Sequence, residues 1–142
     1  MIRKMKLIDS RRMPGLLRTL GYPSTEDELE KRMERIHHHP DYMTYVWEEE
    51  GKLLGFIGMN YSFAYHTNRC HVRVIAFAVA EHAQGRGIGR ALMKQAEAWG
   101  KSKGASTLML NSGNRDERKK THEIYKSWGF EGTATGFYKT VF

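Results

Sequence analysis

Apolar residues along this chain follow two repeats, one typical of strands and one typical of helices. Residues 1–9 alternate loosely between apolar and polar positions and predict a first strand. Residues 10–23 predict a short helix that ends where glycine and proline interrupt the pattern. Residues 24–40 predict a second helix, which begins at a capping box formed by Thr25 and Glu28.

Strands and helices alternate in the second half of the chain. Residues 43–63 predict a hairpin that turns at Glu50 and Gly51. Residues 70–80 form a nearly continuous apolar run, which is typical of a central strand covered on both faces. The remaining pattern predicts a helix over 88–104, a strand over 105–111, a helix over 115–130 and one or two strands over 130–142.

This order predicts an α/β (α+β) fold built on one mixed, mostly antiparallel sheet. We expect about 6–7 strands, with about four helices distributed over both faces of the sheet. Residues 70–111 are expected to form one right-handed strand–helix–strand crossover. A length of 142 residues fits one domain, and no linker or repeat divides the chain, so residues 1–142 are expected to form a single domain.

Composition narrows the class of protein. Hydrophobic residues make up 40% of the chain, which is typical of globular proteins, and a single cysteine, Cys70, excludes an internal disulfide framework. No apolar run approaches the roughly 20 residues of a membrane-spanning helix, and no signal-peptide pattern is present. These observations predict a soluble, cytoplasmic protein without a membrane partner.

A formal net charge of +7 favours an anionic partner, such as a nucleic acid, a phosphorylated cofactor or an acidic substrate. A nucleic-acid-binding module is one hypothesis, because basic residues cluster at Arg115, Arg118, Lys119 and Lys120. No aromatic-interleaved RNA motif and no recognition-helix pattern accompanies this cluster, so a nucleic-acid partner is disfavoured.

The stretch VAEHAQGRGIGRAL, residues 79–92, places three glycines at alternate positions between a predicted strand and a predicted helix. Its spacing fits neither the dinucleotide-binding fingerprint nor the phosphate-binding P-loop. Glycines let backbone amides approach an anion closely, and a helix N-terminus attracts negative charge. The loop is therefore predicted to hold a compact polyanion such as a pyrophosphate, with Arg86 and Arg90 adding charge-assisted bonds at its rim.

Two motifs resemble the GNAT superfamily of acyl-CoA-dependent N-acyltransferases. Gln84, Gly87 and Gly89 match its [RQ]-x-x-G-x-[GA] signature, in the expected place after an apolar strand. Further on, HEIYKSWGF, residues 122–130, is similar to the family's AH-x-F-Y-x-x-x-G-F motif. The resemblance covers nearly the whole chain and implies the GNAT fold in a small, single-domain member.

The resemblance implies that the anion is acetyl-CoA, the acyl-donor substrate. No metal is expected, because the consecutive histidines at 37–39 diverge on a helix and no ligand cluster of zinc spacing accompanies them. The loop amides would hold its pyrophosphate, and the end of the preceding strand would pair with its pantetheine arm. Arg118 would contact a coenzyme phosphate, although its neighbours also fit a solvated helix face. The implied coenzyme-binding residues are Phe77, Ala78, Val79, Gln84, Gly85, Arg86, Gly87, Ile88, Gly89, Arg90, Asn111 and Arg118.

Acetyl transfer to an amine needs one group that takes the amine proton and another that protonates the departing thiolate. A tyrosine hydroxyl, with a pKa of about 10, carries a proton at neutral pH, and the resemblance makes Tyr125 this acid. Composition alone would place Tyr125 in the core, on an apolar stripe with Trp128. The base is open, because Ile75 stands where many relatives carry a glutamate; the candidates are His71, Glu81, His82 and a water chain.

The leading hypothesis is an N-acetyltransferase that transfers an acetyl group from acetyl-CoA to a primary amine of a small molecule or a protein side chain. A non-catalytic acyl-CoA sensor is the alternative that Ile75 keeps open. The acceptor has no signature in the sequence, but the positive charge argues against polycationic acceptors such as aminoglycosides. A homodimer is a common assembly of such folds.

Overall fold

The computed structural model describes residues 1–112 and 119–142, and these divide into two compact units. The first unit, Met1–Leu110, holds the sheet and three of the four described α-helices. The second, Asn111–Phe142, holds α4 (Lys119–Ser127). A single domain over the whole chain remains a prediction.

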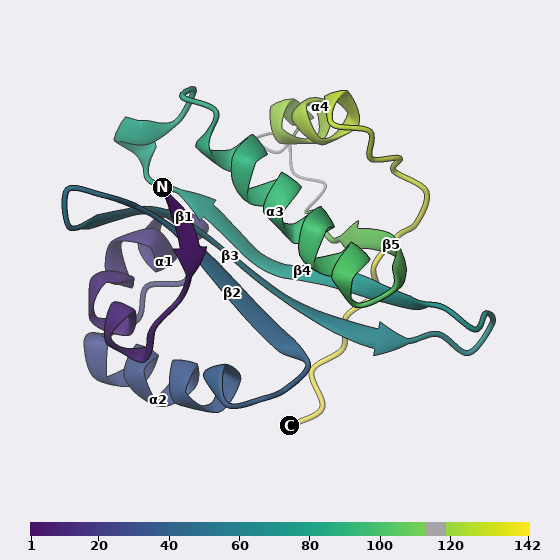
Figure 1. Cartoon of the computed structure of the whole chain (residues 1–142), viewed down its shortest axis with the longest axis horizontal. Coiled ribbons are helices and arrows are strands. Elements are labelled where there is room, and N and C mark those ends of the chain that lie inside the picture. The colour runs from purple at the N-terminus through teal and green to yellow at the C-terminus, as the bar shows by residue number, and fades with distance from the viewer. Residues whose placement is uncertain (113–118) are drawn as a thin grey trace. The chain divides into compact units, whose positions relative to one another are not determined.

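One mixed sheet organises the first unit (Figure 1). Pairing is antiparallel from β1 to β4 and parallel between β4 and β5. The predicted hairpin turn is confirmed: Glu50 and Gly51 both have positive φ, +50° and +77°, as tight hairpin turns require. The strand order is β1 (Ile2–Lys4), β2 (Tyr42–Glu49), β3 (Lys52–Phe63), β4 (Cys70–Val79) and β5 (Ala105–Leu110).

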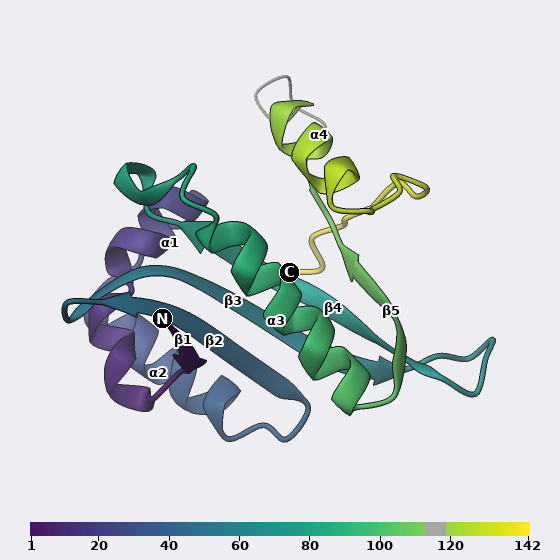
Figure 2. The same cartoon turned by 45° about the horizontal axis from the view of Figure 1, so that its top comes forward.

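Helices cover both faces of this sheet, as the sequence predicts (Figures 1 and 2). The predicted capping box at the start of α2 is confirmed, because the Thr25 amide donates to the Glu28 carboxylate at 3.0 Å and the Glu28 amide donates to Thr25 Oγ1 at 3.1 Å. One face carries α1 (Pro14–Leu20) and α2 (Glu26–His37), and the other carries α3 (Ile88–Ser102). Two short 3₁₀ helices are η1 (Leu7–Arg12) and η2 (Glu81–Ala83).

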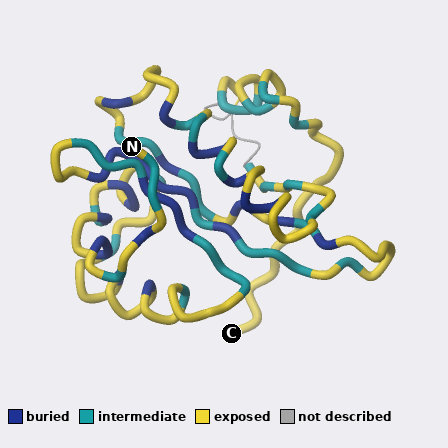
Figure 3. The backbone as a smooth tube through the Cα atoms, viewed as in Figure 1, coloured by how far each residue is buried: buried dark blue, intermediate teal, exposed yellow. Residues whose placement is uncertain are grey.

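Buried residues lie along the strands and on the helices that cover both faces of the sheet (Figure 3). On the α1–α2 face, Leu16 and Leu29 pack in one cluster with Phe56 of β3. On the α3 face, Gly55 lets α3 approach closely, since an added Cβ would lie 3.0 Å from a methyl of Leu92. The single cysteine, Cys70, is buried, and its thiol donates to the Lys103 carbonyl at 3.4 Å.

A β-bulge in β4 changes which side chains face α3. Gly58 pairs with Ala76 and Met59 pairs with Val74, so Ile75 is an extra residue between them. Before the bulge, the valines of β4 face α3; after it, Ala76 packs against the α1–α2 cluster. Ile75 is 51% exposed. The prediction of a strand covered on both faces is therefore wrong at this position.

The sheet is smaller than predicted. In the described part of the chain it has five strands rather than six or seven, and residues 130–142 contain no strand. The tail has strand-favouring threonines and aromatics, but a strand also needs a paired edge, which sequence propensity does not supply. The first strand is also short, because η1 follows it from Leu7.

A buried carboxylate explains the early end of β1. Asp9 is fully buried and accepts hydrogen bonds from Arg3 at 2.7 and 2.9 Å, from the Lys6 amide at 2.7 Å and from Arg12 at 2.5 Å. Both arginines also bind the Glu48 carboxylate, at 3.0 and 2.6 Å. Burial alone would raise the pKa of Asp9, but these hydrogen bonds outweigh it and hold that pKa well below its usual range.

We expect Asp9→Asn to lower the free energy of unfolding at pH 7 by about 2 kcal/mol, because it removes the negative charge to which two guanidinium groups donate hydrogen bonds. In the unfolded chain the pKa of Asp9 is near 4, and at pH values above this the lowered pKa in the folded state stabilises the fold. This stabilisation is lost as the pH falls from about 4 toward the lower pKa of the folded state. Urea unfolding at pH 7 and pH 3 measures both effects. Asp27→Asn, at an exposed position, is the control; equal losses in the two variants would contradict the prediction.

Candidate functional site

The predicted glycine loop connects β4 to α3 and is built on two buried anchors. Ala83 of η2 is 0% exposed and Ile88, the first residue of α3, is 2% exposed. Between them the backbone turns at Gly85 and Gly87, whose φ angles are +82° and +84°. These angles favour glycine, since another residue there costs about 1–2 kcal/mol.

Gln84 closes the base of the loop. Its side-chain Nε2 donates to the carbonyl of Val79, the last residue of β4, at 3.1 Å. The first position of the sequence signature therefore ties the loop to the strand that precedes it. This role is one that the sequence alone did not indicate.

The loop presents backbone amides that no described residue engages. The first α-helical bond of α3 runs from the Ala91 amide to the Gly87 carbonyl at 3.1 Å, so the amides of Ile88, Gly89 and Arg90 precede the helical ladder. A Cβ built on Gly87 meets no heavy atom within 4 Å. Open space beside orphan amides at a helix N-terminus is the geometry that binds a phosphate group.

The strand before the loop has an edge that β5 leaves uncovered. Pairing between β4 and β5 ends at Val74 and Leu110 among the described residues, and β4 continues for five more residues. On its other side, this continuation pairs with β3 from Ala76 to Val79. An extended ligand with amide groups can therefore add to this edge of β4 as another strand would. The predicted residues Phe77, Ala78 and Val79 lie on this segment.

Arg86 does not point its guanidinium toward the loop interior. It donates to both carboxylate oxygens of Glu49, at 2.8 and 2.9 Å, and Glu49 also accepts the indole hydrogen of Trp47 at 3.1 Å. The hydrogen bond from Arg86 is the main cause that lowers the pKa of Glu49. The β2–β3 hairpin thus holds the loop arginine. This ion pair could not be predicted from the run of acidic residues at 48–50.

We expect Glu49→Gln to tighten binding of acetyl-CoA by about two- to fivefold, because it releases Arg86 for a phosphate and exposed ion pairs are weak. Isothermal titration at low salt measures the change. Glu50→Gln removes the same charge from the neighbouring residue, for which no ion pair is present in the described structure. If both variants bind equally well, Arg86 makes no phosphate contact through its side chain.

In the second unit, Tyr125 lies on α4 next to the end of that helix. Its ring contacts those of Trp128 and Phe130, with centroids 6.0 and 5.9 Å away. Gly129 has a φ of +95°, and the Phe130 amide donates to the Tyr125 carbonyl at 3.0 Å, which makes a Schellman cap. Part of the second sequence motif therefore encodes the end of the helix.

Two polar contacts connect the residues before α4 to α4 itself and to the tail that follows it. Asn111 Nδ2 donates to the Tyr138 hydroxyl at 2.6 Å, and His122 Nε2 lies 3.1 Å from Ser112 Oγ. Asn111 was predicted to contact the coenzyme, and this internal bond was not foreseen. Arg118, another predicted coenzyme contact, lies outside the described residues.

The candidate bases occupy different places. His71 is half-buried on β4 and pairs in register with Ser62 of β3. Glu81 and His82 are exposed in η2, immediately before the loop. Ile75, at the position of the usual glutamate, has no group that can accept a proton. The described residues contain no group of three or more His, Cys, Asp or Glu that could hold a metal ion.

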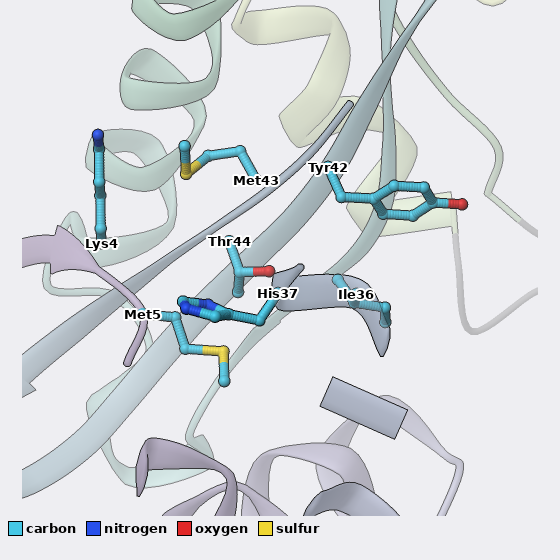
Figure 4. A pocket seen from close by; sticks show the side chains of 7 residues that line it. All are labelled: Lys4, Met5, Ile36, His37, Tyr42, Met43 and Thr44. Carbon is cyan, nitrogen blue, oxygen red and sulfur yellow. The ribbon is translucent and has the colours of Figure 1, made fainter. Parts of the chain in front are cut away.

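A separate hollow of about 110 Å³ lies between the ends of α2, β1 and β2 (Figure 4). His37 and Thr44 lie close together in it, and Lys4 and Met43 point to the other side of the strands. The hollow is small and its lining has no carboxylate.

Among the described helices, none is both long enough and apolar enough to cross a membrane.

Comparisons with known proteins agree with this geometry. The sequence model described as the acetyltransferase (GNAT) family matches residues 11–130. A GNAT family acetyltransferase from Staphylococcus aureus is 28% identical, with a TM-score of 0.85 over 99% of this chain and 98% of that one. No curated protein sequence matches significantly.

Two further solved structures share the fold at lower identity. The glucosamine-6-phosphate N-acetyltransferase of Arabidopsis thaliana is 21% identical, with a TM-score of 0.81 over 99% of this chain and 97% of that one. An aminoglycoside N-acetyltransferase, AAC(6')-Iy, solved in complex with CoA, is 19% identical, with a TM-score of 0.85 over 99% of this chain and 93% of that one.

Proposed function

This chain belongs to the acetyltransferase (GNAT) family of acyltransferases, and from that premise we propose that it transfers an acetyl group from acetyl-CoA to a primary amine. The acceptor is a small molecule or a protein side chain. The observation that carries the proposal is the row of amides that precede the helical ladder of α3, directly beyond a segment of β4 that β5 does not pair with. The family match includes residues of both units, which supports one catalytic domain.

The residues of the loop fit the coenzyme. GNAT acetyltransferases use acetyl-CoA, and the open space at Gly85 and Gly87 leaves room for a pyrophosphate against the amides from Gly85 to Arg90. The Gln84 amide, also predicted to contact the pyrophosphate, instead donates to the Glu81 carbonyl at 3.3 Å. The backbone of Phe77, Ala78 and Val79 would bind the pantetheine arm, and Asn111 would add a polar contact. Bound acetyl-CoA supplies a thioester, which an amine can attack directly.

The remaining chemistry concerns two protons. The acceptor amine must lose a proton before attack, since an ammonium with a pKa of about 10.4 is not nucleophilic. His71 or a water chain takes this proton, because Ile75 cannot. We assign Tyr125 to protonate the departing thiolate, as its position in the second motif suggests. The contacts of its ring with Trp128 and Phe130 would hold the hydroxyl in place.

The related enzymes differ in their acceptors, which are an aminoglycoside in one and glucosamine 6-phosphate in another. Both acceptors carry a primary amine, and they differ in charge. For this chain we therefore propose a primary amine, whose further identity depends on the charge around the acceptor site.

The experiment that tests the function has two readouts. Acetyl-CoA at a hundred times its Kd should stabilise the protein by about 2.7 kcal/mol, or roughly 8 °C in Tm. Free thiol should then appear when a panel of primary amines is added. Stabilisation without thiol release from any amine would favour a coenzyme sensor, and the absence of stabilisation, with binding of RNA instead, would favour a nucleic-acid-binding module.

A further inference from the structure

The point where β5 begins to pair with β4 indicates where the thioester would lie. The edge begins at the loop and runs back along β4 until β5 joins it at Val74. A ligand arm that follows this edge is stopped at the bulge at Ile75, because β5 takes over the pairing there. If the proposed function holds, the reacting group therefore lies near the bulge.

Within the first unit, α3 covers one face of the sheet at this point. Val72 and Val74 are buried on the α3 face, and Val72 lies 3.3 Å from the Cβ position of Gly100 in that helix. On the opposite face, Arg73 and Met109 are exposed beyond the part of the sheet that carries the α1–α2 cluster. Because α3 occupies the first face, we expect the acceptor amine on this second face.

A row of polar side chains crosses that face. Residues paired in register share a face of the sheet, and here Tyr42 of β2 pairs with Asn60 of β3, which pairs with Arg73 of β4. The next row places Ser62 beside His71. The Oδ1 atom of Asn60 is buried and has no hydrogen-bond partner in the described structure.

These two rows of polar side chains carry a positive charge, that of Arg73. Neither row contains a carboxylate, and no described ion pair engages Arg73. The nearest acidic residue along β2 is Asp41, whose carboxylate accepts the hydroxyl hydrogen of Tyr61 and thereby raises the pKa of that tyrosine. The ring of Tyr61 lies on the other face, 6.1 Å from that of Trp99 in α3.

We propose that the acceptor is a primary amine that also carries an anionic group, a carboxylate or a phosphate, and that Arg73 binds this group. A guanidinium on an open sheet face suits both anions because it can donate two parallel hydrogen bonds. The same face would repel a polyamine or an aminoglycoside. The proposal rests on the proposed function, and it adds a specificity-determining residue and a substrate class to it.

The test compares matched amines in a thiol-release assay. Phosphoethanolamine is compared with ethanolamine, and β-alanine with β-alaninamide, so that each pair differs in the anionic group; spermidine is the polycation. We expect kcat/KM to be at least about tenfold higher for the anionic member of one pair. The pair with the larger ratio distinguishes a phosphate from a carboxylate. Higher activity with the neutral members or with spermidine would overturn the proposal.

Variants at Arg73 separate this inference from the proposed function. Arg73→Gln should lower kcat/KM for the anionic amine about tenfold, leave the neutral amine within twofold and leave the Kd of acetyl-CoA unchanged. Lys94→Gln removes the same charge from an exposed position on α3, on the opposite face, and should change neither ratio. If Arg73→Gln releases thiol and keeps the same preference for the anionic amine, only the proposed substrate class is refuted. If the parent protein releases no thiol with any amine, both the proposed function and this inference are refuted.

Discussion

Replacement of Gly87 by tryptophan is expected to weaken binding of acetyl-CoA at least a hundredfold. Gly87 is the N-cap of α3, and the space beside its Cα is open because no heavy atom lies within 4 Å of a built Cβ. An indole there would fill the space in front of the orphan amides of Ile88 and Gly89. The anion would then lose several amide contacts together, and each is worth little alone.

A matched control separates blocked binding from damage to the fold. Gly104, just beyond the other end of α3, also has a positive φ, +78°, and open space at its Cβ position. Gly104→Trp should therefore cost the same 1–2 kcal/mol, roughly, in backbone strain and leave the coenzyme affinity intact. Titration calorimetry measures affinity, and thermal unfolding measures stability. Equal coenzyme affinity in the two variants would mean that the amides of this loop do not hold the pyrophosphate.

The sequence was sufficient to predict the loop, because local rules govern it. Glycine at a positive φ and a helix start after an apolar strand are properties of a few neighbouring residues, and Gly85 and Gly87 carry both. The capping box at Thr25 and Glu28 and the hairpin turn at Glu50 were predicted for the same reason. Such features need no knowledge of distant parts of the chain.

Features that depend on pairing between distant segments were missed. The bulge at Ile75 is set by the register between β3 and β4, and the alternation of β4 alone gives no sign of it. The ion pair between Arg86 and Glu49 joins residues 37 positions apart. Strands were predicted over residues 130–142 from the residue pattern, yet that pattern cannot say whether an edge is available to pair with them.

The second motif has two physical meanings. Its glycine and final aromatic residue, Gly129 and Phe130, form the cap of α4, and this structural role is enough to explain their presence in the motif. The hydroxyl of Tyr125 has no part in that cap, since the cap uses its carbonyl and the ring contacts use its ring. A mutation that removes only this oxygen therefore separates the helix end from the chemistry.

Tyr125→Phe is expected to lower kcat about 10²- to 10³-fold, the range typical for loss of a general acid. The Kd of acetyl-CoA should change less than twofold, because the ring contacts with Trp128 and Phe130 and the backbone cap survive. Thiol release at saturating coenzyme measures kcat, and calorimetry measures Kd. Thermal unfolding should give a Tm within about 2 °C of the parent.

Two further variants complete this experiment. Tyr125→Ala removes the ring as well, so it should lose stability in addition to turnover, which identifies the structural share of the side chain. Tyr65→Phe, at a fully exposed position in the β3–β4 connection, controls for loss of a hydroxyl as such and should match the parent. If Tyr125→Phe also turns over at the parental rate, the thiolate obtains its proton from water or another residue, and the tyrosine of the motif serves the end of α4 alone.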